Sequence, residues 1–572
     1  MKKIISALFT LTTFLGILTH TSSASGIYTY TVINEEAKTA EITAVSAPVP
    51  EDIEIPSQLN GYKIISVGNS VFQNCTELKN ITIPEGITSL GEMIFSGCCN
   101  LENVTLPDSI THIGSYAFEG CSKIAEIDLS DSLTTINNMT FFDCSGLRSI
   151  TIPNNVTVIE DSAFLYCTNL NEINIPKNIT RIESKAFDET AYVNNSSNWI
   201  DNTLYIDDCI LKYNGTDSNY VVKDGIKLIA DRAFSNCTTL IEIEIPDSVN
   251  YIGLGAFRDC SNLKTITSPF IGHSRTENSF LKYLFGAEEL TDSDVIPDSL
   301  ENIAITDTKD IYHSAFKECY KLKRINISDS TTYMPGSVFS SCTALEELTI
   351  PFIGNSSDSE HNLCTLFHTL YKPLNLKKVV ITNATQIPEN AFNEIFSIEE
   401  IYINDSVKEI KAGAFTNCEN LIKLVLPTEN IIVDESNIFS GSHNVTVYGI
   451  QGSEIHKQTA KYGIPFLTLD GKEVPLPEKY NLIDAIAAVY DNKINLSLIF
   501  RTEIKSRFIP VALYDSDDRL CNVEFVSTDN NAENMSLLFD DIPKAEYIKI
   551  FLMKSKESLK PLHVPESIYI KR

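Results

Sequence analysis

Residues 71–91 read VFQNCTELKNITIPEGITSLG, and this stretch sets a pattern that recurs along most of the chain. Two isoleucines, Ile81 and Ile83, alternate with Asn80 and Thr82, as in a short strand with one buried face. The proline that follows cannot donate a hydrogen bond to a ladder, so it ends the strand. The glycine that closes the stretch permits a tight bend. The stretch therefore predicts one coil, made of a strand, a stop and a turn.

The same pattern returns with a period of 23 residues. A phenylalanine stands three residues before each repeat cysteine, and prolines keep the spacing, with Ser130 filling one proline slot. One coil cannot bury its own apolar face, so neighbouring coils must cover it. We therefore predict a leucine-rich-repeat solenoid, β-rich, with short parallel strands and 23-residue coils. The first cysteines in register are Cys75, Cys98, Cys121, Cys144 and Cys167.

The recurring motifs A-F-x-x-C and I-x-I-P resemble those of the BspA-type leucine-rich repeat, a 23-residue class found in bacterial surface proteins. The resemblance covers about residues 50–445. Val447-Tyr448-Gly449 resembles the start of the family's C-terminal cap. A cap is also physically required, because the last coil would otherwise expose a bare sheet edge and core. The resemblance implies a surface protein that attaches to host matrix proteins, other cells or surface polymers.

The chain has 572 residues and is expected to contain several segments. Lys2, Lys3 and the apolar run that follows are typical of a secretory signal peptide cleaved near Ala24. Alternating runs near the C-terminus predict a small antiparallel β-sandwich. Within the repeats we expect irregular insertions near 190–222, 269–300 and 351–375. We expect a signal peptide at residues 1–24, an N-terminal cap of strands at 25–66 and the leucine-rich repeats at 67–445. After the repeats we expect a C-terminal cap at 446–470, a linker at 471–479 and the accessory β-sandwich at 480–572.

Composition excludes some partners. The formal net charge is −30, which repels phosphate backbones and argues against nucleic-acid binding. Beyond the signal peptide no apolar run reaches the about 20 residues that a spanning helix needs. We therefore expect a soluble, monomeric mature protein that is secreted, or retained at the cell surface.

The repeat cysteines allow two interpretations. Coils stack about 4.8 Å apart, which is within reach of a disulfide. Alternatively, each cysteine is a small buried side chain with a weak donor. The second interpretation is favoured, because Thr190 and Ser442 fill the same slot in other coils. No cysteine pair has the spacing of a zinc site.

The outward positions of the predicted strands carry many carboxylates. An ordinary polar face is one interpretation, and a calcium site is another, because strand-borne carboxylates are hard oxygen ligands. Paired carboxylates also hydrolyse glycosides when they are held at the right separation. No H-E-x-x-H, G-x-S-x-G or phosphate-loop motif occurs, so no catalytic, cofactor or metal residue is assigned. The candidate binding face consists of Glu126, Asp128, Glu172, Glu242, Glu244, Glu347, Glu400 and Tyr402.

These observations predict a non-catalytic binding or adhesion protein that presents its repeat surface to a host protein, another cell or a surface polymer. Two alternatives stay open. One is a polysaccharide- or cell-wall-active hydrolase on a solenoid scaffold. The other is a structural spacer that holds the C-terminal domain.

Overall fold

The structure, a computed structural model, describes the chain from residue 21 onward with gaps. Residues 1–20, which carry most of the expected signal peptide, lie outside the described residues. None of the helices in the described part has the length and apolarity that crossing a bilayer requires. The described residues are 21–275, 280–289, 291–292, 295–357, 360–367, 373–393, 395–434, 436, 438–462, 464–472, 482–490, 493–504, 508–514, 520–527, 532–539, 547–550 and 567–569.

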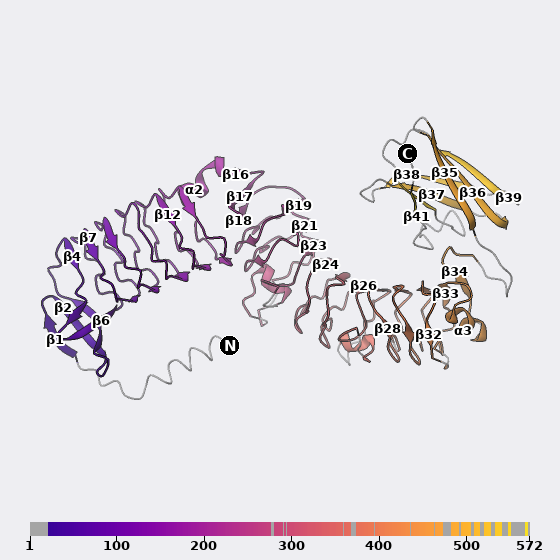
Figure 1. Cartoon of the computed structure of the whole chain (residues 1–572), viewed down its shortest axis with the longest axis horizontal. Helices are drawn as coiled ribbons and strands as arrows, with labels where there is room; N and C mark the ends of the chain where they lie inside the picture. The colour runs from indigo at the N-terminus through magenta and orange to yellow at the C-terminus, as the bar shows by residue number, and fades with distance from the viewer. Residues whose placement is uncertain are drawn as a thin grey trace. The chain divides into compact units, whose positions relative to one another are not determined.

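The chain forms two compact units, residues 1–308 and residues 309–572. Each contains coils stacked side by side, and the strand arrows of successive coils lie along the same side of the stack (Figure 1). Inward isoleucines alternate with outward polar residues on these strands, as in β21, where Ile243 is buried between two exposed glutamates. The predicted leucine-rich-repeat solenoid is therefore confirmed.

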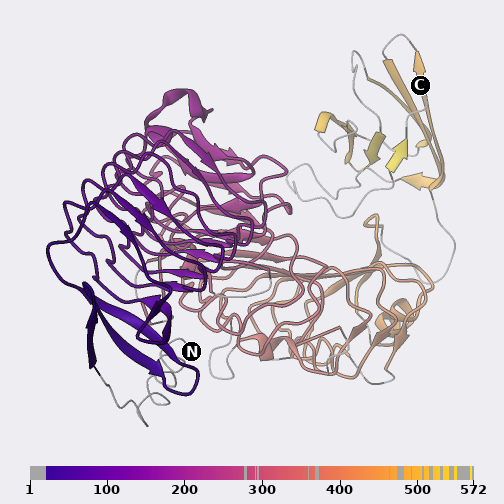
Figure 2. The ribbon, with the colours of Figure 1, turned by 60° about the vertical axis from the view of Figure 1, so that its left-hand side comes forward.

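A sheet of longer strands begins unit 1. Strand β2 (Tyr28–Asn34) pairs antiparallel with β1 (Thr21–Ser25) and with β3 (Thr39–Val45). Strand β6 (Tyr62–Val67) pairs parallel with β3 and antiparallel with β5 (Gln58–Leu59). Figure 2 shows this sheet at the indigo end of the stack. It joins the solenoid through β6, which pairs with the short strand β8 of the next coil.

The main ladder of unit 1 consists of the I-x-I strands, paired in parallel in three sets. The first set is β4 (Asp52–Glu54), β7 (Asn80–Thr82) and β9 (Asn103–Thr105). The second is β12 (Ser149–Thr151) and β14 (Glu172–Asn174). The third is β19 (Asn219–Val221), β21 (Glu242–Glu244), β23 (Thr265–Ser268) and β24 (Asn302–Ile305).

A second ladder of two-residue strands runs along another side of the coils. It comprises β8 (Ser89–Leu90) and β10 (His112–Ile113), then β11 (Thr135–Ile136), β13 (Val158–Ile159) and β15 (Arg181–Ile182). After an interruption it continues as β20 (Leu228–Ile229) and β22 (Tyr251–Ile252).

The interruption is the segment around 190–222. It contains the short helices α2 (Ala191–Asn194) and η1 (Ser196–Asn198) and the strands β16 (Trp199–Ile200), β17 (Thr203–Ile206) and β18 (Cys209–Tyr213). Strands β17 and β18 form an antiparallel hairpin, and β18 pairs with β20. A 3-10 helix, η2 (Leu281–Phe285), stands in the later irregular coil.

The A-F-x-x-C turn supplies a ladder of stacked rings. From Phe72 to Phe187, the centroids of consecutive rings lie 5.2–5.6 Å apart. The central rings are fully buried, and burying such a side chain stabilises the fold by about 1.5–3 kcal/mol. This stacking ties each coil to its neighbours, which is how a repeat protein is held together.

The repeat cysteines act as hydrogen-bond donors in this core. The Cys144 thiol donates to the main-chain oxygen of Phe118 in the preceding coil, at 3.0 Å. Ser442 makes the corresponding contact with the Phe415 oxygen at 2.5 Å. Burial raises the pKa of Cys98 to about 12. These contacts agree with the small buried donor that the sequence favours for this slot.

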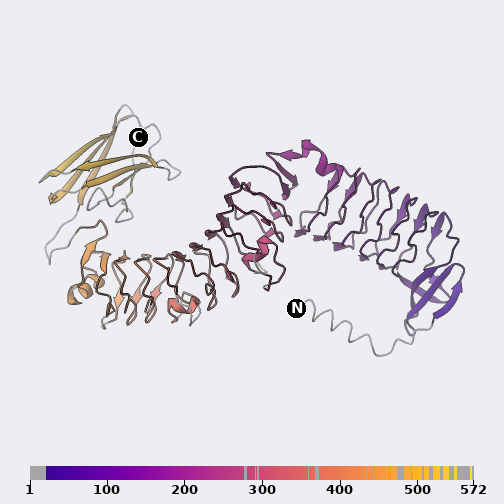
Figure 3. The ribbon, with the colours of Figure 1, turned by 180° about the vertical axis from the view of Figure 1, so that it is seen from behind.

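Unit 2 repeats the plan (Figure 3). Its main ladder holds β25 (Arg324–Ile327), β26 (Glu347–Ile350), β27 (Lys378–Ile381), β29 (Glu400–Ile403), β31 (Lys423–Leu426), β33 (Thr446–Gly449) and β34 (Phe466–Thr468), all parallel. Its second ladder holds β28 (Gln386–Ile387), β30 (Glu409–Ile410) and β32 (Ile432–Val433). The 3-10 helix η3 (Leu363–Leu366) stands in an irregular coil, and α3 (Glu454–Tyr462) precedes β34.

The C-terminal segment contains longer antiparallel strands. Strand β36 (Lys493–Ile504) pairs with β35 (Leu482–Tyr490) and β39 (Ala532–Phe539). Strand β37 (Phe508–Tyr514) pairs with β38 (Leu520–Ser527) and β40 (Tyr547–Ile550), and β40 pairs with β41 (Ser567–Tyr569).

Candidate binding face

The outward side chains of the unit 2 sheet form two columns that run across its strands. In the first, which we call the charged column, residues paired in register alternate in sign from strand to strand. The second, which we call the aromatic column, lies two residues further along each strand and therefore on the same face. The charged column is Arg324, Glu347, Lys378, Glu400 and Lys423. The aromatic column is Val380, Tyr402, Val425 and Tyr448.

Two cations flank Glu347 in the charged column. Arg324 Nε lies 3.6 Å from Glu347 Oε2, and Lys378 Nζ lies 3.9 Å from the same oxygen. These side chains are 37–52% exposed, so each pair contributes only about 0.2–1 kcal/mol to stability. The pairs instead hold the side chains in place. The acidic residues predicted here therefore belong to a face of mixed charge.

Tyr402 contacts charged side chains of its own strand and of both neighbouring strands. Its hydroxyl donates to Glu400 Oε2 at 2.9 Å and accepts a hydrogen bond from Lys423 Nζ at 2.8 Å. Lys423 Nζ lies 4.8 Å from the centroid of the Tyr402 ring and 5.4 Å from that of Tyr448, within cation–π range. Lys378 Nζ lies 5.5 Å from the Tyr402 centroid. Burial raises the pKa of Tyr402, so its phenol stays protonated at neutral pH.

In unit 1 the predicted face residues have different neighbours. Glu242 and Glu244 are both exposed on β21. Glu242 stands in register between Asn219 and Thr265, so it has no basic residue beside it in either neighbouring strand. Glu172 is exposed on β14 and stands beside Ser149. This part of the face is therefore acidic and polar.

Two predicted positions lie outside any strand. Glu126 and Asp128 are exposed, but residues 126–128 form no strand, contrary to the sequence prediction. In this coil Ser130 replaces the proline that follows the strand in other coils. Ser130 is buried, and its hydroxyl donates to the Asp108 main-chain oxygen at 3.0 Å. The strand is thus missing in the coil whose proline slot holds a serine.

Sequence reasoning missed the basic members of the charged column and Tyr448. The signal was present, because Lys378 and Lys423 occupy the first outward position of their strands, as Glu347 and Glu400 do. Lys423 also follows Glu400 at the regular spacing of 23 residues. Lys378 was harder to find, because an irregular coil separates it from Glu347 by 31 residues and only the strand register shows that the two are neighbours.

The described residues contain no group of three or more His, Cys, Asp and Glu side chains that could hold a metal ion. Glu360 lies in one irregular coil, and its Oε1 is 3.3 Å from Lys411 Nζ. The described residues therefore offer no preformed cluster of ligands for the calcium site that the sequence left as an alternative.

Comparison with known families identifies the repeat. The family model described as BspA type leucine rich repeat region matches residues 65–194, 204–304, 297–364 and 366–461, which is more than half of the chain. The chain belongs to the BspA-type leucine-rich repeat family. In these BspA-type repeats the I-x-I strands form the main ladder and the A-F-x-x-C turns form the ring ladder.

No curated protein matches the chain. Solved structures of similar fold include a leucine-rich cell surface protein of Faecalibacterium prausnitzii, 22% identical over 77% of this chain and 97% of that one, with a TM-score of 0.30. A leucine-rich repeat protein of Bacteroides ovatus is 21% identical over 78% and 99%, with a TM-score of 0.22. An internalin of Listeria monocytogenes is 12% identical over 65% and 81%, with a TM-score of 0.23. Similarity at this level carries no conclusion about function.

Proposed function

We propose that this protein is a non-catalytic binding protein of the bacterial cell surface or its surroundings, and that its repeat sheet recognises a protein or a surface polymer. The observation that carries the proposal is the outward face of the unit 2 sheet. There Tyr402, Lys378 and Lys423 are exposed or half-buried, and neighbouring strands hold them in place. A preorganised face loses less side-chain entropy on binding, which favours recognition.

The residue types on this face fit macromolecular recognition. Tyrosine combines a large apolar ring with a polar hydroxyl, and tyrosine and arginine are enriched among the residues that dominate binding energies. Both signs of charge alternate beside the ring, so a partner must match a pattern and not only a net charge. The acidic positions Glu172, Glu242 and Glu244 of unit 1 are proposed as a second contact region.

The remaining parts of the chain are assigned supporting roles in this proposal. Residues 1–24 direct export, and residues 480–572 form an accessory β-sandwich. The family found across the repeats supports placement outside the cytoplasm.

The proposal is tested by measuring binding of the full mature chain to an array of matrix proteins, wall polymers and glycans, with and without calcium. We expect at least one saturable ligand. We also expect Tyr402→Ala to lower the affinity for that ligand by about tenfold or more, which is the effect of removing a central aromatic contact. Lys408→Gln is the matched control, because Lys408 is exposed in the same unit but precedes the second-ladder strand β30. Equal losses in both variants, or no loss in Tyr402→Ala, would contradict a binding role for this face.

A further inference from the structure

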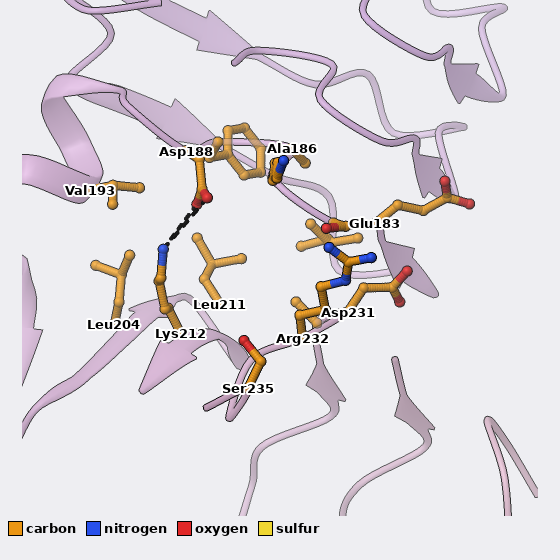
Figure 4. Close-up of a pocket in the computed structure, with 15 residues that line it drawn as sticks. Glu183, Ala186, Asp188, Val193, Leu204, Leu211, Lys212, Asp231, Arg232 and Ser235 are labelled. Carbon is orange, nitrogen blue, oxygen red and sulfur yellow. Dashed lines mark hydrogen bonds and ion pairs between the residues drawn. The ribbon is translucent and has the colours of Figure 1, made fainter. Parts of the chain in front are cut away.

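A pocket opens in unit 1 where the inserted hairpin interrupts the stack (Figure 4). Strand β20 pairs with the hairpin strand β18 and not with β15, while Asp231 N donates to the Ile182 oxygen of the preceding coil at 3.1 Å. The ring ladder also breaks at this point. Phe187 stacks on Phe164, whereas the next ring, Phe234, packs against Tyr213 of the hairpin. The pocket therefore fills a discontinuity in the core.

The pocket has an apolar wall and the volume of a small ligand. Its volume is about 170 Å³. A dry cavity of about 150 Å³ lined by apolar side chains accepts benzene, so one ring or one branched chain fits here. The apolar lining consists of Ile182, Ala186, Phe187, Val193, Leu204, Leu211 and Ala230.

The acidic residues of the lining already have cationic partners. Arg181 lies 3.1 Å from Glu183 Oε1 and 3.7 Å from Asp231 Oδ2. Asp188 pairs with Lys212, whose Nζ lies 3.3 Å from Asp188 Oδ1. Because Glu183 and Asp231 share the single charge of Arg181, these contacts offset only part of the negative charge of the lining.

Two further cations stand in the lining, and one of them, Arg232, interacts electrostatically with Asp231. Lys185 and Arg232 are exposed, and neither forms an ion pair with any residue that the structure describes. Figure 4 shows the Arg232 side chain reaching toward the middle of the pocket, with Asp231 on its far side from Leu211. The Ser235 hydroxyl adds a hydrogen-bonding group to the same lining. An apolar wall thus meets two cations, Lys185 and Arg232, that form no ion pair within the described part of the chain.

We propose that this pocket binds a carboxylate that carries an adjacent ring or branched apolar group, with the apolar group against Phe187 and Leu211 and the carboxylate at Arg232. Arginine suits this role because its guanidinium donates two parallel hydrogen bonds to a carboxylate. Such a group occurs in small free acids and at the C-terminus of a peptide that ends in an apolar residue. This site is independent of the sheet face proposed above.

The test is calorimetric titration of the full mature chain with phenylacetate and with its neutral amide, phenylacetamide. We expect saturable binding of phenylacetate and at least tenfold weaker binding of the amide, because a charge-assisted contact is lost. Arg232→Gln is expected to lower the affinity for phenylacetate by about tenfold. Arg258→Gln, which removes an exposed cation of the next coil outside the lining, is expected to leave binding unchanged.

A second titration distinguishes the sources of the carboxylate. Tighter binding of the tripeptide Gly-Gly-Phe than of phenylacetate identifies a peptide C-terminus, and the reverse identifies a small free acid. Both results support the proposal. The absence of saturable binding by either probe overturns it, as does equal binding of acid and amide or an Arg232→Gln variant that binds like the parent chain. A thermal melt of each variant shows whether it is folded.

Discussion

Cys144 illustrates what its slot in the repeat requires of a side chain. The thiol is fully buried and donates to the oxygen of Phe118, a contact that a serine makes in a later coil. We predict that Cys144→Ser destabilises the protein less than Cys144→Ala does, by about 1 kcal/mol, because alanine loses the hydrogen bond. The free energy of unfolding in urea measures the difference. Equal losses in the two variants would mean that only the volume of the side chain matters.

Buried thiols also predict a response to alkali. Burial raises the pKa of Cys98 and of Cys167 to about 12, from 9.0. The unfolded chain therefore releases these protons first, so their contribution is fully present below about pH 9 and is lost as the pH rises from 9 toward 12. Each thiol contributes a slope of up to about 1.4 kcal/mol per pH unit.

The measurement is the free energy of unfolding between pH 9 and pH 10.5 for the parent chain and for Cys167→Ser. A smaller loss in the variant is expected, because serine does not titrate in this range. A variant that loses stability as steeply as the parent chain would assign the alkaline sensitivity to other groups.

Single residues also show what the repeat could not predict. The sequence explains Gly91 by a tight bend, but the structure gives a different reason. A Cβ on Gly91 would lie 2.4 Å from the main-chain carbon of Gly68 in the preceding coil. Other coils carry a glutamate in this slot, and the carboxylate of Glu160 accepts from Asn138 N at 2.9 Å. Local sequence cannot reveal such contacts, because they involve the neighbouring coil.

At the scale of the element, the ring ladder gives a positional prediction. Phe118 stacks on both neighbours, at 5.3 Å on each side, whereas Phe187 ends its ladder and, among the described residues, stacks only on Phe164. We predict that Phe118→Ala costs about 3–5 kcal/mol of stability and that Phe187→Ala costs less, because its site already borders the pocket. Urea unfolding of both variants measures the two losses. A larger loss for Phe187→Ala would contradict the role assigned to the ladder.

The strands could be predicted from the sequence. The binding face could be predicted only in part, because strand register decides which of its residues are neighbours. The alternation of isoleucine with polar residues is local, so it identifies most strands. Which outward residues meet depends on coil length, and Glu347 and Lys378 are neighbours although 31 residues separate them, whereas 22 separate Lys378 from Glu400. The sequence thus predicted Glu347, Glu400 and Tyr402 as face residues but not the lysines that hold them.

Across the full chain, we propose that the repeats carry recognition and that residues 480–572 have a supporting role. Repeat proteins hold their coils through contacts between neighbours, so a stack with both caps does not depend on a following domain for its stability. We propose that the strands β1, β2, β3, β5 and β6 at one end of the repeat region, and the segment of α3 and β34 at the other, serve as these caps. The binding face is therefore expected to function without the C-terminal strands.

The most direct test compares the affinity of the full mature chain with that of residues 25–470 and of residues 474–572 for the same ligand from the array. We predict that residues 25–470 bind with the dissociation constant of the full chain and that residues 474–572 do not bind. Saturable binding by residues 474–572 alone would contradict it, and would reduce the repeats to a spacer.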